Sequence, residues 1–257
     1  MKTVIIFCLF LASNLCYAGI YQLNVISLKK CRQDFAVKLC KTQPLIYDCY
    51  RFRKTKAEYV TWQEAFENEK NKDRLITVLQ KVNRRNTIIW PNHCIAIPKD
   101  IANRDEMLYT PFNKYLPDTK EKIIIVDLNI FAWAAYQNHK LLKWGSAVGG
   151  IGRCKETGKY ECKTPVGIWK VIRKGPAVSK SQLYPVECED KSICGHPLYH
   201  LIQFHPNGSE IHGDKTIGTG MGNISHGCVR VHREDSKWLN KEFAETNKTI
   251  IKVLPYK

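Results

Sequence analysis

One stretch near the C-terminal end combines a thiol with two imidazole groups. Residues 211–214 (IHGD) are followed, after a glycine-rich loop, by residues 225–230 (SHGCVR). Cys228 can act as a strong nucleophile once an imidazole removes its proton and stabilises the thiolate. Spacing leaves two bases open, because His226 points to the same side of an extended chain as Cys228, whereas His212 can fold back across the loop. These residue types predict nucleophilic catalysis by a cysteine–histidine pair.

The backbone around the thiol also suits this chemistry. Gly227 lets the main chain approach a substrate carbonyl closely, because it has no side chain. Backbone N–H groups at this point could form an oxyanion hole, a contribution worth roughly 3–4 kcal/mol per donor.

The number of cysteines predicts that one thiol stays free. The chain has 11 cysteines, and two of them lie in an N-terminal segment, residues 1–18, that is typical of a signal peptide. That segment has Lys2, an apolar run and small residues before the cleavage point, and the run is shorter than the roughly 20 residues of a membrane span. An uncleaved anchor is the alternative. Nine cysteines remain, which is an odd number, and an oxidising compartment favours pairing.

The remaining cysteines fall into groups along the chain. Cys154 with Cys162 and Cys188 with Cys194 are close enough in sequence to close short loops. The first four are compatible with three pairings, and they are Cys31, Cys40, Cys49 and Cys94. Zinc is disfavoured because no spacing matches a CxxC pattern.

The charge of the chain narrows the classes of partner. A formal net charge of +16 favours polyanions such as acidic lipid or an anionic wall polymer. Export makes nucleic acid the least favoured partner, and the basic residues are scattered without interleaved aromatic residues. Beyond residues 1–18 no segment is apolar enough to cross a bilayer.

The N-terminal half predicts a small α+β domain. Residues 19–44 carry two cysteines and little periodicity, so we expect an extension tied by disulfides to the domain after it. Residues 45–99 predict a strand, a helix that Thr61 and Glu64 begin with a capping box, a second helix at about 72–83, and a strand at 94–98. Residues 100–120 are polar and contain prolines, which favours a linker or an entry strand.

The C-terminal part, residues 121–257, predicts a mainly β domain. Short β-branched or aromatic segments recur between Gly and Asn turns, which is typical of a sandwich or barrel. One helix is expected after the cysteine, at about 234–245, with acidic residues in its first turn. The predicted strands lie at 123–126, 132–136, 141–144, 146–150, 167–172, 199–204, 210–212 and 249–254.

Two family resemblances arise from these motifs. Residues 45–99, with an Asn-rich break before the closing strand, resemble a LysM glycan-binding module, although the usual Gly before the last strand is absent. Residues 121–255 resemble the L,D-transpeptidase (YkuD-type) catalytic domain. The His-Gly pair followed by SHGCVR is similar to that family's signature, and the segments 163–169 (KTPVGIW) and 196–199 (HPLY) look like its upstream companions.

The second resemblance implies a role for each residue of the motif. It makes Cys228 the nucleophile and His212 the general base, oriented by the backbone carbonyl of Gly213. The remaining roles concern the oxyanion site, the cysteine loop and the substrate, and they fall to His226, Gly227, Ser225, Arg230 and Tyr199. Tyr199 would be a cleft wall or a helper of the oxyanion site, although core packing is the favoured alternative for this residue. No metal or organic cofactor is implied.

The same resemblance implies the reaction. Cys228 would form a thioester with a peptidoglycan tetrapeptide stem, and an amine would then resolve it. A diaminopimelate amine gives a 3→3 crosslink, a protein amine tethers an envelope protein, and water makes the enzyme an L,D-carboxypeptidase. Carbapenem-type β-lactams would acylate Cys228. The expected location is the periplasm or cell envelope of a bacterium.

Two other classes of function compete with this one. A non-catalytic peptidoglycan-binding protein would use residues 45–99, and the intact pair of His212 and Cys228 argues against it. A thiol–disulfide oxidoreductase would normally need a CxxC motif, which the sequence lacks.

Overall fold

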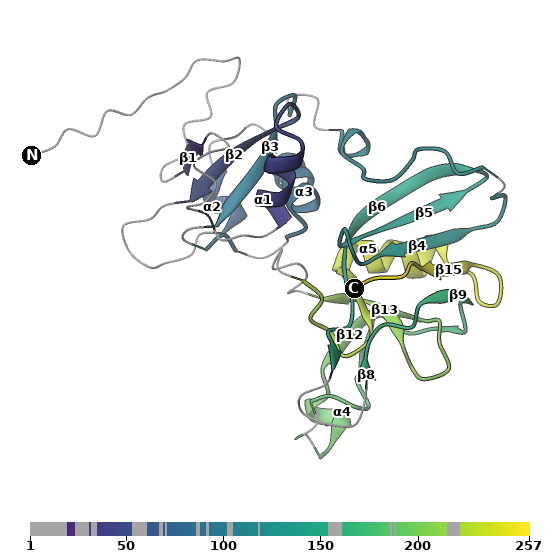
Figure 1. Cartoon of the computed structure of the whole chain (residues 1–257). Helices are drawn as coiled ribbons and strands as arrows, with labels where there is room; N and C mark the ends of the chain where they lie inside the picture. Colours follow the sequence, from purple (N-terminus) through teal and green to yellow (C-terminus); the bar gives the residue numbers. More distant parts are fainter. Residues whose placement is uncertain are drawn as a thin grey trace, which may run out of the picture. The chain divides into compact units, whose positions relative to one another are not determined.

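The computed structural model describes most of the chain beyond the N-terminal segment. The described residues are 20–23, 31, 35–52, 61–66, 69, 71–85, 88–90, 93–101, 105–117, 119–153, 161–185, 187, 189–214 and 222–257. The predicted signal peptide lies outside them. No helix among the described residues is long and apolar enough to span a membrane. The chain divides into two compact units, Met1–Leu79 with Ile88–Arg104 and Gln80–Thr87 with Asp105–Lys257 (Figure 1).

The first unit is built on an antiparallel sheet with strand order β1-β2-β3. The strand–helix–helix–strand order predicted for residues 45–99 is present as β2, α2, α3 and β3. Thr61 caps α2 and forms the predicted capping box, because its hydroxyl accepts from the backbone of Glu64 and its own N–H donates to the Glu64 carboxylate. The elements are β1 (Ile20–Leu23), α1 (Phe35–Thr42), β2 (Tyr47–Phe52), α2 (Trp62–Ala65), α3 (Lys72–Asn83) and β3 (Cys94–Pro98).

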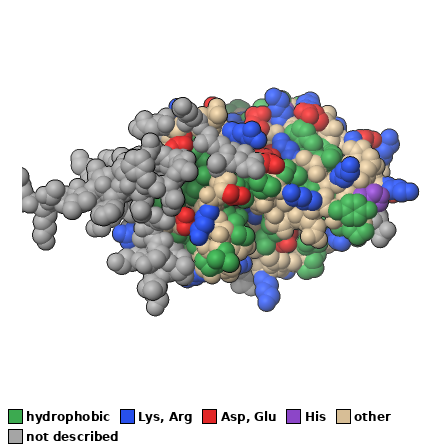
Figure 2. Space-filling model, turned by 90° about the horizontal axis from the view of Figure 1, so that it is seen from above, with side chains coloured by type: hydrophobic (Ala, Val, Ile, Leu, Met, Phe, Trp, Pro, Cys, Tyr) green, Lys and Arg blue, Asp and Glu red, His purple; other side chains and the backbone are tan. Residues whose placement is uncertain are grey.

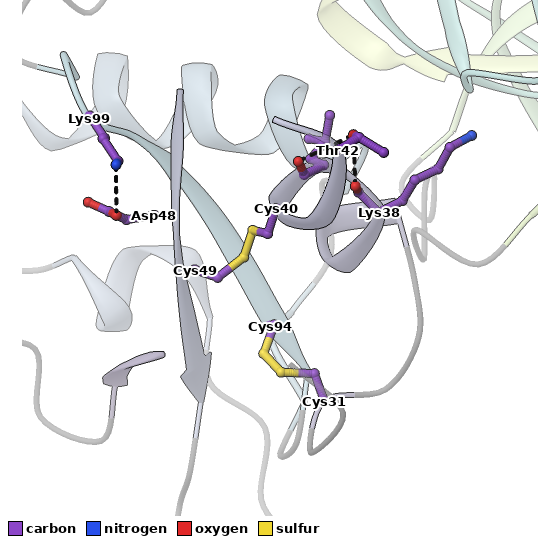
Figure 3. Close-up of a disulfide and its surroundings, with 9 residues drawn as sticks. Cys31, Lys38, Cys40, Thr42, Asp48, Cys49, Cys94 and Lys99 are labelled. Atoms are coloured by element: carbon purple, nitrogen blue, oxygen red, sulfur yellow. Dashed lines mark hydrogen bonds and ion pairs between the residues drawn. A yellow bond between two sulfur atoms is a disulfide. The ribbon is translucent and has the colours of Figure 1, made fainter. Parts of the chain in front are cut away.

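Two disulfides connect the N-terminal stretch to this sheet (Figure 3). Cys40 of α1 is bonded to Cys49 of β2, and Cys31 is bonded to Cys94 of β3. Of the three pairings that the sequence allows, this is therefore the one present. Because the helix is linked to one strand and the segment before it to another, α1 is held against the sheet at two points.

The second unit is a curled, mainly β domain, which confirms the predicted fold class. Its long sheet has the order β10-β12-β13-β14-β6-β5-β4-β15-β9, with β11 paired to β12. Its elements are η2 (Glu106–Leu108), β4 (Ile123–Asp127), β5 (Ala132–Gln137), β6 (Lys140–Val148), β7 (Gly152–Arg153), β8 (Glu161–Cys162), β9 (Gly167–Lys170), β10 (Arg173–Lys174), β11 (Val178–Lys180), α4 (Lys191–Cys194), β12 (Pro197–Gln203), β13 (Glu210–Asp214), β14 (Val229–His232), α5 (Arg233–Trp238), η3 (Leu239–Phe243) and β15 (Ile250–Val253).

The core of this unit follows from the alternation of side chains along the strands. Every second residue of β4, β5, β14 and β15 belongs to the apolar core, and on β4 and β5 the residues between them are largely buried as well. Leu239 and Phe243 of η3 close the core from the helical side. The helix predicted at about 234–245 is present as α5 followed by the π-helical turn η3, with Glu234 and Asp235 in its first turn.

One strand differs from the prediction. Residues 141–144 and 146–150 were expected as two strands, but β6 runs without a break from Lys140 to Val148. It stays continuous because Trp144, Gly145 and Ser146 pair in regular register with β5 across the point where the break was expected. Gly149 and Gly150 then leave the ladder and bind the loop that precedes Cys228.

Part of the stretch predicted as a linker packs on the second unit. Trp144 Nε1 donates to the carbonyl oxygen of Glu106 at 2.9 Å, and the Tyr136 hydroxyl donates to that of Asn113 at 2.7 Å. The N–H of Leu116 donates to the carbonyl oxygen of His139 at 2.8 Å. Residues 105–117 are therefore bound to the β5–β6 hairpin.

The basic residues are dispersed over the surface. Figure 2 shows Lys and Arg side chains across the visible face, interspersed with polar and apolar groups and fewer acidic ones. The net charge of +16 is thus not gathered into a single patch on this face.

Candidate active site

Cys228 is the one free thiol among the described cysteines, and it is half-buried. The other six described cysteines are disulfide-bonded. Cys228 immediately precedes β14, which runs parallel to β13 with His212 opposite Arg230. Extending this register by one residue on each strand beyond Ile211 and Val229 places Glu210 opposite Cys228. The parallel pairing therefore aligns Cys228 with the start of β13.

His212 lies in the middle of β13 and is 4% exposed. Its Nδ1 is 3.1 Å from the carbonyl oxygen of Gly213. The carbonyl oxygen can only accept a hydrogen bond. In the neutral imidazole ring Nδ1 therefore carries the proton, and Nε2 is left as the acceptor. Because side chains alternate along strands and paired residues share a face, His212 and Cys228 lie on the same face of the β13–β14 pair. The tautomer leaves Nε2 able to take a proton.

The pKa shifts of this pair favour its electrically neutral form. Burial, reinforced by the positive charge of Arg230, lowers the pKa of His212 to about 4 against the opposing hydrogen bond to Gly213. Burial and the carboxylate of Glu210 raise the pKa of Cys228 to about 12. A preformed thiolate–imidazolium pair is therefore disfavoured before a substrate binds. The arrangement instead suits proton transfer to His212 during nucleophilic attack.

Ser225 fixes the loop that carries the thiol. Its buried hydroxyl donates to the carbonyl oxygen of Cys228 and accepts from the N–H of Gly227 at 3.1 Å. Gly227 has a φ of 118°, a conformation that favours glycine. The N–H of Gly227 is thus already engaged, which argues against the oxyanion role expected for it. Among the described residues the N–H of Cys228 has no hydrogen-bond partner, so it is the better candidate donor.

A second layer of hydrogen bonds holds the same loop against the end of β6. The backbone N–H of Ser225 donates to the carbonyl oxygen of Gly149 at 2.8 Å. The Thr164 hydroxyl accepts from the N–H of Gly150 at 2.9 Å, and the Tyr256 hydroxyl bridges the Thr164 N–H and the Gly150 carbonyl. A Cβ on Gly150 would overlap the carbonyl oxygen of Cys162. The KTPVG segment therefore braces the cysteine loop through Thr164.

Arg230 lies on the same face as Cys228 and His212. It pairs with Asp214 at 3.3 Å, and its buried Nε has no hydrogen-bond partner in the part of the chain that the structure describes. The ion pair keeps a positive charge close to His212, which is one cause of that residue's low pKa. Arg230 is thus placed both to support β13 and to meet a substrate acceptor group through Nε.

Tyr199 lies on the opposite face from His212, which fits core packing rather than a place in the substrate cleft. Tyr199 pairs with Gly213, and its ring lies 3.5 Å from the guanidinium carbon of Arg233 at the start of α5. A Cβ on Gly213 would overlap Ser236 Oγ on the same side. The odd-numbered residues of β13 thus face α5, and Tyr199 packs with them rather than beside Cys228.

Sequence reasoning missed two residues of the site. The ring of Tyr184 stacks on that of His226, with centroids 4.0 Å apart and planes 15° apart. Tyr184 belongs to the loop that ends at the disulfide-bonded Cys194, so this loop reaches the cysteine segment. No sequence pattern indicates that contact.

The second missed residue is Glu210, which is only 4% exposed. Burial raises its pKa to about 7, against the opposing charge of Arg173. Strand alternation could have found it, because a residue two positions before His212 must share its face.

A free thiol and an imidazole with an available Nε2, on one face of two neighbouring strands inside a curled β-sheet, define a cysteine-nucleophile site of the acyl-transfer class. The family model of the L,D-transpeptidase catalytic domain matches residues 121–251. The chain therefore belongs to the L,D-transpeptidase catalytic domain family, and the resemblance seen in the sequence is confirmed. The match does not reach residues 45–99, whose LysM-like character stays a prediction.

Solved structures of similar proteins are described as L,D-transpeptidases. One from Xylanimonas cellulosilytica shares 20% identity, covers 69% of this chain and 77% of its own, and has a TM-score of 0.49. One from Stackebrandtia nassauensis shares 24% identity over 62% of this chain and 66% of its own, with a TM-score of 0.43. Mycobacterium tuberculosis L,D-transpeptidase 1 shares 17% identity over 52% and 62%, with a TM-score of 0.38. No curated protein matches the chain.

Proposed function

We propose that this protein is an exported cysteine L,D-transpeptidase that acts on peptidoglycan tetrapeptide stems. The observation that carries the proposal is that the free Cys228 thiol and His212 lie on the same face of the β13–β14 pair, inside a domain of this family. The Nδ1 contact of His212 to Gly213 supports its role as general base.

In the first half-reaction Cys228 Sγ attacks the carbonyl carbon at the L-centre of the third stem residue. The thiol proton passes to Nε2 of His212, and the oxyanion forms beside the backbone N–H of Cys228. Collapse of the intermediate breaks the bond to the terminal D-Ala, whose amine takes the proton from His212. The product is a thioester on Cys228 and free D-Ala.

In the second half-reaction an amine resolves the thioester. A diaminopimelate amine yields a 3→3 crosslink, and a protein amine yields an attached envelope protein. Ser225 and Thr164 support both steps by fixing the backbone of the cysteine loop, and Arg230 offers a cation to a substrate carboxylate. His226 acts on the loop through its stack with Tyr184.

The cysteines support export. Six described cysteines are disulfide-bonded, and disulfides persist in oxidising compartments. Together with the predicted signal peptide, this favours the cell envelope of a bacterium, where the proposed substrate is found.

Incubation of the purified protein with a disaccharide-tetrapeptide tests the proposal, with product masses as the readout. A crosslinked dimer supports transpeptidation, and a tripeptide supports the L,D-carboxypeptidase alternative. Cys228→Ala is the control, and its thermal melting must match that of the parent. The absence of any product, together with no mass adduct on Cys228 after meropenem, would contradict the proposal and favour a non-catalytic peptidoglycan-binding protein.

A further inference from the structure

Glu210 is a buried acid beside the thiol that the mechanism above does not use. It is the first residue of β13 and is 4% exposed. It shares the face of His212, and the β13–β14 register places it opposite Cys228. The charge of Glu210 also acts on the thiol, because it is one of the causes that raise the pKa of Cys228.

The carboxylate of Glu210 has no hydrogen bond and no ion pair with any described residue. Arg173, whose positive charge opposes the rise in the pKa of Glu210, is itself engaged, because its Nε donates to the side chain of Gln203 at 2.5 Å. A buried, unpaired carboxylate is costly and raises the pKa of the neighbouring thiol. Asp214, the other acid on this face, is by contrast paired with Arg230. A benefit at another step of the reaction would explain why the unpaired acid is kept.

The second half-reaction contains a step that needs a base, namely the deprotonation of the acceptor. An amine acceptor arrives as an ammonium ion, R–NH3+, which has no lone pair for attack. Conversion of the thioester and R–NH3+ into an amide and a thiol releases one net proton. His212 accounts for the proton that ends on the Cys228 sulfur, and the other must be removed before the C–N bond forms.

We propose that Glu210 is the base that removes this first proton, so that the acceptor of this enzyme is a primary ammonium group bound against the Glu210 carboxylate. The carboxylate takes a proton from R–NH3+, and the neutral amine attacks the thioester carbonyl carbon. His212 takes the second proton and gives it to the departing sulfur, and the Glu210 carboxylic acid later releases its proton to water. This inference rests on the proposed function.

The surroundings of Glu210 suit this role. Its pKa of about 7 makes its carboxylate a stronger base toward ammonium than an ordinary carboxylate. Two cations act on this site, namely Arg230, which Asp214 neutralises, and Arg173. His212 is neutral because of its low pKa. Glu210 is thus the anion free to meet a cationic acceptor.

Separate assays of the two half-reactions test this role in the purified protein. Acylation is followed as the mass of the Cys228 thioester with donor stem alone, and transfer is followed after adding a stem peptide with a free diaminopimelate amine. We expect Glu210→Gln to slow transfer by about 100-fold and to leave acylation unchanged or faster, because no anion then opposes the thiolate. The deficit in transfer should shrink as the pH approaches the pKa of the acceptor amine.

Two further variants make the test specific. Glu210→Asp keeps a carboxylate and should recover part of the transfer rate. Asp214→Asn removes the paired acid of the same face and should change both half-reactions by similar factors. Equal loss of both rates in Glu210→Gln, or unchanged transfer, would overturn the role of Glu210. Failure of the unmodified protein to acylate at all would overturn the proposed function itself, and it is seen before any acceptor is added.

Discussion

The two faces of the β13–β14 pair differ in polarity and in the number of titratable side chains, although they share the same backbone. One face carries Ile211, Val229 and Val231, which are at most 1% exposed and belong to the apolar core. The other face carries titratable side chains, namely Glu210, His212, Asp214, Cys228 and Arg230. The alternation of side chains along a strand places these two sets on opposite sides.

This comparison shows how the site obtains both rigidity and reactivity. The apolar face fixes the two strands against α5 and η3. The titratable side chains of the polar face are therefore held at defined positions even where they form no hydrogen bonds with one another. Burial on the polar face shifts the pKa values of three neighbouring residues, Glu210, His212 and Cys228. Substitutions on the polar face should therefore change activity, whereas substitutions on the core face should change stability.

The largest effect is expected for the nucleophile. Cys228→Ser should reduce donor turnover by on the order of 10⁴-fold or more, because a serine hydroxyl beside a weakly basic His212 is a far poorer nucleophile. Its thermal melting should stay within about 2 °C of the parent. A turnover assay with a melting curve on the same sample checks both, and a large drop in melting temperature would show that Cys228 also has a structural role.

The next effect concerns the base. His212→Gln should slow acylation by about 10²–10⁴-fold. In the unmodified protein His212 is unprotonated above its pKa of about 4, so the acylation rate should be level between about pH 5 and 8 and fall below about pH 4. Rapid-quench mass spectrometry across this pH range measures it. A rate that rises tenfold per pH unit through pH 7 would instead indicate that the thiol loses its proton to solvent before attack, without His212 as the base.

Glu210, on the polar face, is expected to lower the free energy of unfolding of the protein when its carboxylate is ionised. A pKa of about 7 in place of the ordinary 4.5 means that the folded state resists ionisation of Glu210, which costs about 3 kcal/mol above pH 7 and nothing below pH 4.5. Glu210→Gln should therefore raise the free energy of unfolding at pH 8 by up to this amount and have little effect at pH 4. Denaturant titrations at the two pH values check the sign, and an equal effect at both would contradict it.

The smallest effect is expected on the core face. Gly213→Ala places a Cβ that overlaps Ser236 Oγ and lies 3.0 Å from Arg233 Cα, so it should lower the free energy of unfolding by about 2 kcal/mol. Adding Ser236→Ala should recover part of the loss, because it removes the overlapped atom. Denaturant unfolding of the two single variants and the double variant measures the coupling, and strict additivity would contradict this packing.

Local patterns predicted much of this fold. Thr61 and Glu64 specify the start of α2 by contacts within one turn, and the periodicity of residues 72–83 specifies α3. The break expected near residue 145 is absent because β6 obtains its continuity from its ladder with β5, a pairing that no local pattern encodes. The pairing of the first four cysteines likewise depends on how α1 lies against the sheet.

The candidate site likewise contains residues that the sequence predicts and contacts that it does not. Cys228, His212 and Ser225 stand out because their motifs lie close together in the sequence. The stack of Tyr184 on His226 and the engagement of the Gly227 N–H with Ser225 depend on contacts that no spacing encodes. The true side of Tyr199 follows from its pairing with Gly213, which a register shift in β12 accompanies.

The proposed function depends above all on one claim, that a peptidoglycan stem acylates the free thiol of Cys228. The most direct measurement is the intact mass of the protein, quenched in acid within seconds of mixing with disaccharide-tetrapeptide, followed by peptide mapping. We expect an adduct equal to the donor minus D-Ala, located on Cys228 and absent from Cys228→Ser and from samples pretreated with meropenem. An adduct on another residue, or turnover of the donor by Cys228→Ser at the parent rate, would contradict the claim.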